Sequence, residues 1–319
     1  MIVIHAKGNS QLGIGNLSRS YELVNHLSKK EKVIGIFECK DNIFERYANE
    51  NIIQSNSLIE SLNIIKKNKC TIYISDLVDP DKDLSDKLRS IGVKFILHFN
   101  GIDFGFEPDI LFITDDFDYK FSNNRFKIYR GFKYYIVGQE ILKRRKKEIF
   151  PTKSIKNILI CFGGADPGFF TEYFAKTIND STYNYTIVLG PAMQNNRKEY
   201  IKSINKKNIY YIDSPENMVE LLLNNDLLVT LGGMTTYEAM CLGVPASAVR
   251  WSYLEYNVKS FGEKNMIIDL GNIEEAYQNL LNLDIDGINN TCQNAYNIIN
   301  GNALKNIETV IDSLKGDNL

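Results

Sequence analysis

Residues 226–245 read "DLLVTLGGMTTYEAMCLGVP" and hold the strongest indication of the fold. The run "DLLVTL" is typical of a buried strand, and "MTTYEAMCL" is typical of a helix. Between them, Gly232 and Gly233 would let the backbone approach a ligand closely. A strand that turns into a helix brings unpaired N–H groups and the positive end of the helix dipole to one point. This stretch therefore predicts an anion site in an α/β fold.

Three side chains after these glycines have suitable chemistry for a nucleotide. Thr235 and Thr236 offer hydroxyl groups for a phosphate. Glu238 follows one helical turn later and could accept hydrogen bonds from a vicinal diol such as a ribose. A structural role is the alternative, in which a threonine caps the helix and Glu238 complements its N-terminus. The two roles are compatible, and the sequence leaves both open.

Two further glycine turns follow predicted strands and precede predicted helices. They are "GIGN" at 13–16, with Gly13 and Gly15, and "GGADPG" at 163–168. A single such turn is common in α/β folds for packing reasons alone, but three in one chain favour a phosphorylated ligand. The chain has no G-x-x-x-x-G-K-[ST] motif and no dinucleotide fingerprint in a suitable context, which argues against P-loop and dinucleotide-binding proteins.

Strand and helix patterns alternate along both halves of the chain, which implies parallel sheets covered by helices. The stretch 142–154, "LKRRKKEIFPTKS", is charged and is interpreted as an interdomain linker, with a solvated helix end as the alternative. We therefore predict a Rossmann-like domain at 1–145, a second one at 155–300, and a closing helix and tail at 301–319. Ligands bind beyond the carboxyl ends of parallel strands, so we expect a site in a cleft between the two domains.

Composition narrows the class of protein. The chain has 319 residues, 44% of them hydrophobic, and a formal net charge of −2, which gives no electrostatic footprint for nucleic acid. Its five cysteines form no C-x-x-C pair, which argues against a disulfide framework or a zinc site. The sequence shows no leader peptide and no run of apolar residues that approaches a membrane span. We expect a cytoplasmic protein without a nucleic-acid partner.

The stretch "GGMTTYEAMCLGVP" resembles the nucleotide-sugar motif of GT-B glycosyltransferases, in particular the lipid II N-acetylglucosaminyltransferases. The segments "ICFGGADPG", "SPENMVELLLNNDLLVTLGG", "RGFKYYIV" and "QLGIGNLSRS" are similar to the UDP-sugar hydrolase of the pseudaminic acid pathway. This resemblance implies a GT-B fold, in which two Rossmann-like domains have parallel sheets facing each other across a cleft. It also implies a UDP-sugar substrate and no metal or other cofactor.

The resemblance carries over to particular residues of the second half. Gly164 and Asp166 would lie near the diphosphate, and Met218 would lie near the uracil. The threonines and Glu238 of the 232–245 motif would hold the phosphate and the ribose. The second domain would thus bind the nucleotide, while the loop with Gly13 and Gly15 would face the sugar and the nucleophile.

The first half departs from the hydrolase pattern at several positions, and one of them bears on the chemistry. Asn16 stands where the resembled family has a histidine that activates water. Asparagine has no pKa near neutrality and cannot act as a general base, although it can hydrogen-bond a sugar or a phosphate. His98 and Asp103, which follow a predicted strand, and Asp76, which ends another, are replacement candidates. For each of them a capping or turn role is the alternative.

The sequence therefore predicts an enzyme of surface-glycan biosynthesis that cleaves the anomeric C–O bond of a UDP-sugar and releases UDP. The sugar would pass to a glycan or another acceptor. The alternatives are a UDP-sugar hydrolase with a relocated base and a non-catalytic nucleotide-sugar binding protein. The basic runs "KRRKKE" and "IKSINKK" are most simply solvated, but beside exposed aromatic residues they could contact anionic lipid. The oligomeric state is not predicted.

Overall fold

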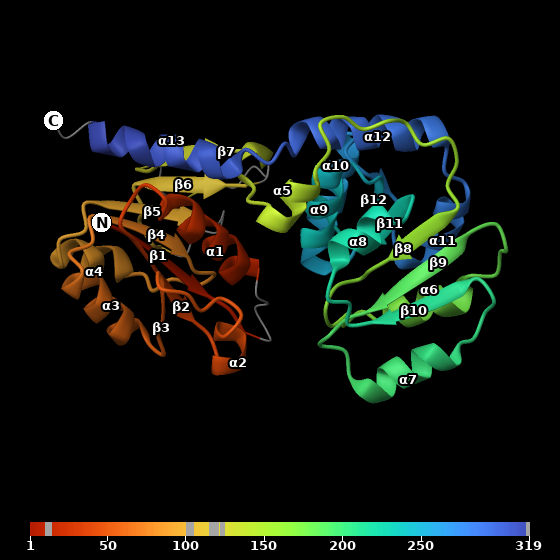
Figure 1. Cartoon of the computed structure of the whole chain (residues 1–319), viewed down its shortest axis with the longest axis horizontal. Coiled ribbons are helices and arrows are strands. Elements are labelled where there is room, and N and C mark those ends of the chain that lie inside the picture. The colour runs from red at the N-terminus through yellow and green to blue at the C-terminus, as the bar shows by residue number, and fades with distance from the viewer. Residues whose placement is uncertain (10–14, 100–104, 115–120, 122–124, 317–319) are drawn as a thin grey trace. The chain divides into compact units, whose positions relative to one another are not determined.

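The computed structural model describes residues 1–9, 15–99, 105–114, 121 and 125–316 (Figure 1). The chain divides into two compact units. The first unit combines Met1–Gly138 with Gly301–Leu319, and the second is Gln139–Asn300. Because the first unit takes in both ends of the chain, the second unit is a single continuous segment of it.

The first unit contains a parallel sheet of seven strands in the order β3-β2-β1-β4-β5-β6-β7. The strands are β1 (Ile2–Lys7), β2 (Val33–Glu38), β3 (Ile52–Gln54), β4 (Ile72–Asp76), β5 (Phe95–Phe99), β6 (Ile110–Ile113) and β7 (Lys127–Arg130). The helices of this unit are α1 (Gly15–Leu27), α2 (Asp41–Phe44), α3 (Leu58–Lys67), α4 (Leu84–Ser90), the short η1 (Phe132–Tyr134) and α13 (Ala303–Gly316). The strand order reverses at β1 and β4, and ligands of such sheets bind at this kind of switch point.

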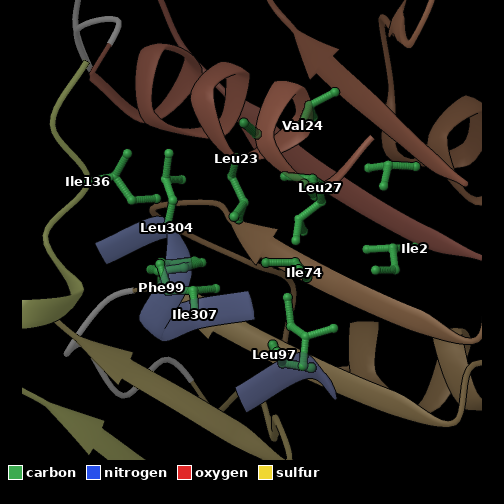
Figure 2. Packing of buried hydrophobic residues seen from close by; sticks show 14 of the residues in the cluster. Ile2, Leu23, Val24, Leu27, Ile74, Leu97, Phe99, Ile136, Leu304 and Ile307 are labelled. Atoms are coloured by element: carbon green, nitrogen blue, oxygen red, sulfur yellow. The ribbon is translucent and has the colours of Figure 1, made fainter. Parts of the chain in front are cut away.

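Alternate residues of these strands enter two hydrophobic cores, because successive side chains of a strand point to opposite faces. On one face Ile74 and Leu97 pack with Leu23 of α1 and with Ile307 of α13, as Figure 2 shows. The other core contains Val3, Tyr73 and Ile96 of the strands together with residues of α3 and α4. The last helix of the chain thus completes the core of the first unit.

The second unit contains a parallel sheet of six strands in the order β10-β9-β8-β11-β12-β13. The strands are β8 (Asn157–Ile160), β9 (Asn184–Leu189), β10 (Ile209–Asp213), β11 (Leu227–Thr230), β12 (Ala246–Ala248) and β13 (Ile268–Asp269). The helices are α5 (Gln139–Arg144), α6 (Phe170–Thr177), α7 (Asn195–Ser203), α8 (Met218–Leu223), α9 (Met234–Leu242), the short η2 (Ser252–Leu254), α10 (Glu255–Glu263), α11 (Ile273–Leu281) and α12 (Ile285–Ile298). Here the order reverses at β8 and β11.

The α/β prediction with two parallel sheets is confirmed. The predicted linker is in part helical, because residues 142–144 form the last part of α5. Lys143 and Arg144 lie in the last turn of that helix, where positive charge is favourable near the C-terminal carbonyl groups. In the described part of the chain, no helix combines the length and the apolar character that crossing a membrane requires.

Candidate functional site

The turn between β11 and α9 is built around Gly232. This residue has φ +82°, and a Cβ atom there would lie 2.8 Å from Cγ2 of Val258, so the position requires glycine. The Asn257 side chain donates a hydrogen bond to the Gly232 carbonyl oxygen at 3.2 Å, which fixes the turn from α10. At Gly233, the N-cap of α9, a Cβ would have no described atom within 4 Å. The backbone before α9 is therefore open to a ligand.

The turn after β8 is open in the same way. Gly163 has φ +89°, and a Cβ added to Gly163 or Gly164 would meet no described atom within 4 Å. The loop after β9 supports this turn from one side, since the Ala192 N–H donates to the Gly164 carbonyl oxygen at 2.9 Å. Because β8 and β11 pair with each other, the two open turns begin from adjacent strands at the switch point of the sheet.

Helix α9 places its polar side chains at this switch point. Thr236 is fully buried, and its hydroxyl group has no hydrogen-bond partner among the described residues. Glu238 is half-buried, and burial raises the pKa of its carboxyl group. Within the described ranges no hydrogen bond or ion pair compensates this carboxylate. Polar groups that are desolvated without a partner cost free energy, so hydrogen-bond donors of a ligand would stabilise both side chains.

Cys161 shows that the predicted residues gather around the end of β8. Burial raises the pKa of its thiol to about 11, and the nearby carboxylates of Glu238 and Asp166 act in the same direction. A hydrogen bond with the Thr235 side chain opposes that shift. Residues from both glycine turns thus surround one buried, protonated thiol.

Asp166 lies beside the first turn, but its carboxylate is bound by the protein. It accepts hydrogen bonds from the N–H groups of Phe170 at 3.1 Å and Thr171 at 2.9 Å, at the start of α6. It also accepts one from Nη2 of Arg197 at 2.9 Å. Burial raises the pKa of Asp166 against the effect of these bonds. The structure therefore gives Asp166 a role in closing the N-terminus of α6, and its proximity to a diphosphate stays a prediction.

Met218 is the first residue of α8 and is half-buried. The Asn217 side chain caps this helix by accepting a hydrogen bond from the Glu220 N–H at 3.1 Å. The cap fixes where the helix begins and hence where Met218 lies. The predicted contact of Met218 with uracil is not tested by this geometry.

In the first unit, Asn16 belongs to a hydrogen-bonded group at the β1–β4 switch point. Its Nδ2 donates to the carbonyl oxygen of Asp76 at 3.3 Å, and its Oδ1 accepts from Nη2 of Arg19 at 3.1 Å. Arg19 also holds the Asp76 carboxylate through both of its oxygens, with Nε 2.6 Å from Oδ2. Gly15, where α1 begins, precedes this group directly. Asn16 is thus an oriented amide, and its second N–H has no hydrogen-bond partner among the described residues.

Two of the replacement bases are buried. Asp76 is 1% exposed, and besides Arg19 it accepts a hydrogen bond from Ser20 at 3.0 Å. His98 is 2% exposed and edge-on to Phe106, with ring centroids 5.2 Å apart. Neither ring nitrogen of His98 has a partner among the described residues, and burial lowers its pKa to about 3. A group with this pKa is a weak base at neutral pH, so the geometry does not favour His98 as the base.

Gly13 and Asp103 lie outside the described residues. The sequence reasoning did not identify Arg19 or Arg197, which orient other site residues. The helical spacing of Asn16 and Arg19 was the one local indication, since residues three apart are neighbours on a helix. Over the described part of the chain, no cluster of three His, Cys, Asp or Glu residues is arranged to hold a metal ion.

Comparison with known proteins gives distant relatives. No known family profile matches the chain. It is 29% identical over 265 residues to an uncharacterized protein of Methanocaldococcus jannaschii, covering 76% of this chain and 54% of that protein. The chain thus spans about half the length of that relative. It is 25% identical over 289 residues to the spore coat polysaccharide biosynthesis protein SpsG of Bacillus subtilis, covering 84% and 83% of the two chains.

Solved structures share the fold over nearly the whole chain. MurG of Acinetobacter baumannii superposes with a TM-score of 0.68 at 13% identity, covering 98% of this chain and 99% of that one. UDP-GlcNAc 2-epimerase from Neisseria meningitidis, solved bound to UDP-GlcNAc, gives a TM-score of 0.60 at 14% identity, with 98% and 100% covered. At these identities the likeness shows the fold alone. Together with the two parallel sheets, it confirms the predicted GT-B fold.

Proposed function

We propose that this protein is a nucleotide-sugar-dependent enzyme of glycan biosynthesis that transfers the sugar of a UDP-sugar to an acceptor. The observation that carries this proposal is the pair of open glycine turns at the β8–β11 switch point beside the uncompensated carboxylate of Glu238. The name of the Bacillus subtilis relative supports a role in polysaccharide biosynthesis, and the ligand of the Neisseria meningitidis epimerase supports a UDP-sugar as the substrate.

The nucleotide would bind to the second unit. N–H groups of Gly164 and of the start of α9 would face the diphosphate, and the dipole of α9 would stabilise the negative charge of the departing UDP. Glu238 would accept hydrogen bonds from the ribose hydroxyl groups, and Met218 would contact the uracil. No metal or other cofactor is part of the proposal.

In the proposed reaction the bond between the anomeric carbon and the phosphate oxygen breaks, and an acceptor oxygen bonds to that carbon. UDP leaves with the electron pair of the broken bond, and the proton of the acceptor hydroxyl passes to the phosphate oxygen of the departing UDP. Asn16, held between Arg19 and Asp76, would donate its remaining N–H to the sugar. An amide supports positioning rather than proton transfer, so Asn16 cannot replace the histidine that activates water in the resembled hydrolases.

Hydrolysis with a relocated base remains a second candidate. It requires a base other than the histidine of the resembled hydrolases. Among the described candidates, Asp76 is bound by Arg19 and Ser20. Burial lowers the pKa of His98 to about 3, which makes it a weak base. Asp103 would then be the remaining candidate from the sequence.

The test is a UDP-release assay on a panel of UDP-sugars, with and without glycan acceptors, together with calorimetric titration of UDP. We expect UDP to bind and release to require an acceptor. Rapid release without an acceptor that Asp103→Asn abolishes and Asn16→Ala does not would establish the hydrolase instead. UDP binding without turnover under all conditions would indicate a non-catalytic binding protein, and absence of UDP binding would overturn the proposal.

A further inference from the structure

The turn between β8 and α6 contains two residues in an unfavourable backbone conformation. Asp166 has φ +42° and Phe169 has φ +59°, and neither is a glycine. Left-handed conformations of such residues are unfavourable and persist only where surrounding contacts impose them. The contacts that hold this backbone conformation start at Ala165, the residue after Gly163 and Gly164.

Arg197, in the first turn of α7, supplies these contacts from outside the turn. Its Nη1 donates to the carbonyl oxygens of Ala165 at 3.0 Å and Asp166 at 2.6 Å. Its Nη2 donates to the Asp166 carboxylate at 2.9 Å, and the guanidinium carbon lies 4.4 Å from the centre of the Phe169 ring. One planar cation thus holds three residues of the turn, including both that have positive φ.

The same guanidinium compensates two buried carboxylates. Besides Asp166, it binds both oxygens of Glu172, with Nη2 2.5 Å from Oε2. Asp166 is 1% exposed and Glu172 8%. The hydrogen bond with Glu172 raises the pKa of Arg197, so the cation stays charged. Without it, two buried negative charges would remain beside the turn, and both would repel a phosphate.

We propose that Arg197 is a positioning residue for a nucleoside diphosphate. It fixes the backbone that follows Gly163 and Gly164 and removes the local negative charge, while its own donors are occupied by the protein. This inference rests on the proposed function for the identity of the ligand. The planar fork of arginine suits the task, because a lysine ammonium cannot bind two carbonyl oxygens and two carboxylates in the same arrangement.

The test compares Arg197→Met and Arg197→Lys with a matched control, Arg145→Met, in the full chain. Arg145 likewise binds backbone carbonyl oxygens and lies over an aromatic ring, although no carboxylate among the described residues pairs with it. It donates to the carbonyl oxygens of Tyr296 at 2.8 Å and Ile299 at 3.0 Å, and its guanidinium lies 3.5 Å from the Tyr296 ring centre. Its loss should therefore lower stability without affecting the turn.

Two measurements separate positioning from stability. Hydrogen–deuterium exchange of the ligand-free protein reports on the amides of Phe170 and Thr171, which donate to Asp166. Calorimetry reports the UDP affinity below the unfolding temperature. For Arg197→Met we expect roughly tenfold faster exchange and roughly tenfold weaker UDP binding, with Arg197→Lys intermediate in both. If Arg197→Met does not fold, Arg197→Lys alone decides.

Equal exchange in the Arg197 and Arg145 variants at these amides would overturn the inference. Unchanged UDP affinity in a variant with faster exchange would also overturn it, because the turn would then not matter for the ligand. If the unaltered protein does not bind UDP, the proposed function fails, and the exchange result still decides whether Arg197 holds the turn.

Discussion

Glu238 illustrates how a single residue can be placed at a cost to stability. Its carboxylate is half-buried with no compensating partner in the described part of the chain, and burial raises its pKa. The ionised form is therefore less favourable in the folded protein than in the unfolded one. A ligand that donates hydrogen bonds would recover this free energy, which is the arrangement expected of a binding residue.

We predict that Glu238→Gln weakens UDP binding roughly tenfold, about 1.4 kcal/mol, because a charged acceptor is replaced by a neutral one. The unfolding temperature should stay the same or rise, since an amide is cheaper to bury than a carboxylate. Titration calorimetry and thermal unfolding measure the two effects. Glu274→Gln, an exposed substitution on α11, is the control and should change neither. Unchanged UDP affinity in Glu238→Gln would remove the ribose assignment.

His98 provides a prediction on pH. Burial lowers its pKa from 6.5 to about 3, so the folded protein keeps it neutral while the unfolded chain binds a proton below pH 6.5. Stability should therefore fall as the pH decreases from about 6.5 toward 3, by about 2 kcal/mol at pH 5. His98→Gln should remove this part of the acid sensitivity in denaturant unfolding. Ser75→Ala, a buried neighbour in register on β4, should retain it. Equal pH profiles for the parent and His98→Gln would contradict the prediction.

At the scale of elements, helix α1 and strand β4 are joined by an ion pair that orients Asn16, in which the Asp76 carboxylate is buried and the Arg19 side chain is half-buried. Arg19 and Asp76 are 57 residues apart in the sequence, and no local pattern links them. The sequence could predict the helix start, and it indicated that a base is missing at Asn16. It could not predict that the Asp76 carbonyl oxygen and Arg19 would hold the amide, because the contact with Asp76 depends on the pairing of β1 with β4.

We predict that Asp76→Asn destabilises the protein by about 3 kcal/mol, because it leaves the Arg19 guanidinium without its carboxylate partner. Asn16→Ala should cost about 1 kcal/mol or less, since it removes two hydrogen bonds of a half-buried amide. Urea unfolding of both variants, monitored by circular dichroism, measures the difference. If both variants lost a similar amount of unfolding free energy, the ion pair between Arg19 and Asp76 would not be what joins α1 to β4.

Helix α13 is a second element whose packing could not be predicted from the sequence. Its apolar spacing predicts a closing helix, but an amphipathic pattern does not specify the sheet that it covers. In the structure it packs on the first sheet through Leu304, Ile307 and Ile311 (Figure 2). His26 of α1 lies 2.9 Å from Glu308 and adds a polar contact between the two helices. No local sequence pattern predicts that α13 packs on the first sheet, because this packing depends on tertiary contacts.

We predict that Ile307→Ala lowers the free energy of unfolding by about 2–4 kcal/mol, because it leaves a cavity at a fully buried position. Lys305→Ala, on the exposed face of the same helix, should change it by no more than about 0.5 kcal/mol. Denaturant unfolding of the two variants is the measurement. Comparable effects would mean that α13 contributes little to the core.

For the whole molecule, local signals were enough for the fold class. Strand runs, helical spacing and glycine turns recur in both halves, and each half forms a parallel sheet. The glycines of the two turns in the second unit were also predictable, because positive φ and close approach leave few other residues. What supports those turns was not, since Arg197 and Asn257 act from other elements. Local sequence patterns thus predicted the glycines of the ligand-facing backbone, but not the side chains from other elements that hold it in place.

The last prediction concerns the two units produced separately. Residues 139–300 are continuous and have their own hydrophobic core, so we expect them to fold cooperatively alone. Because the proposed nucleotide residues all belong to this segment, it should bind UDP within about tenfold of the full chain, a difference of up to about 1.4 kcal/mol. Residues 1–138 alone lack the α13 part of their core and should not fold cooperatively. Circular dichroism, thermal unfolding and UDP calorimetry test both segments. If the full chain binds UDP and a folded 139–300 segment does not, the nucleotide site requires residues of the first unit, and the assignment to the second unit alone is wrong.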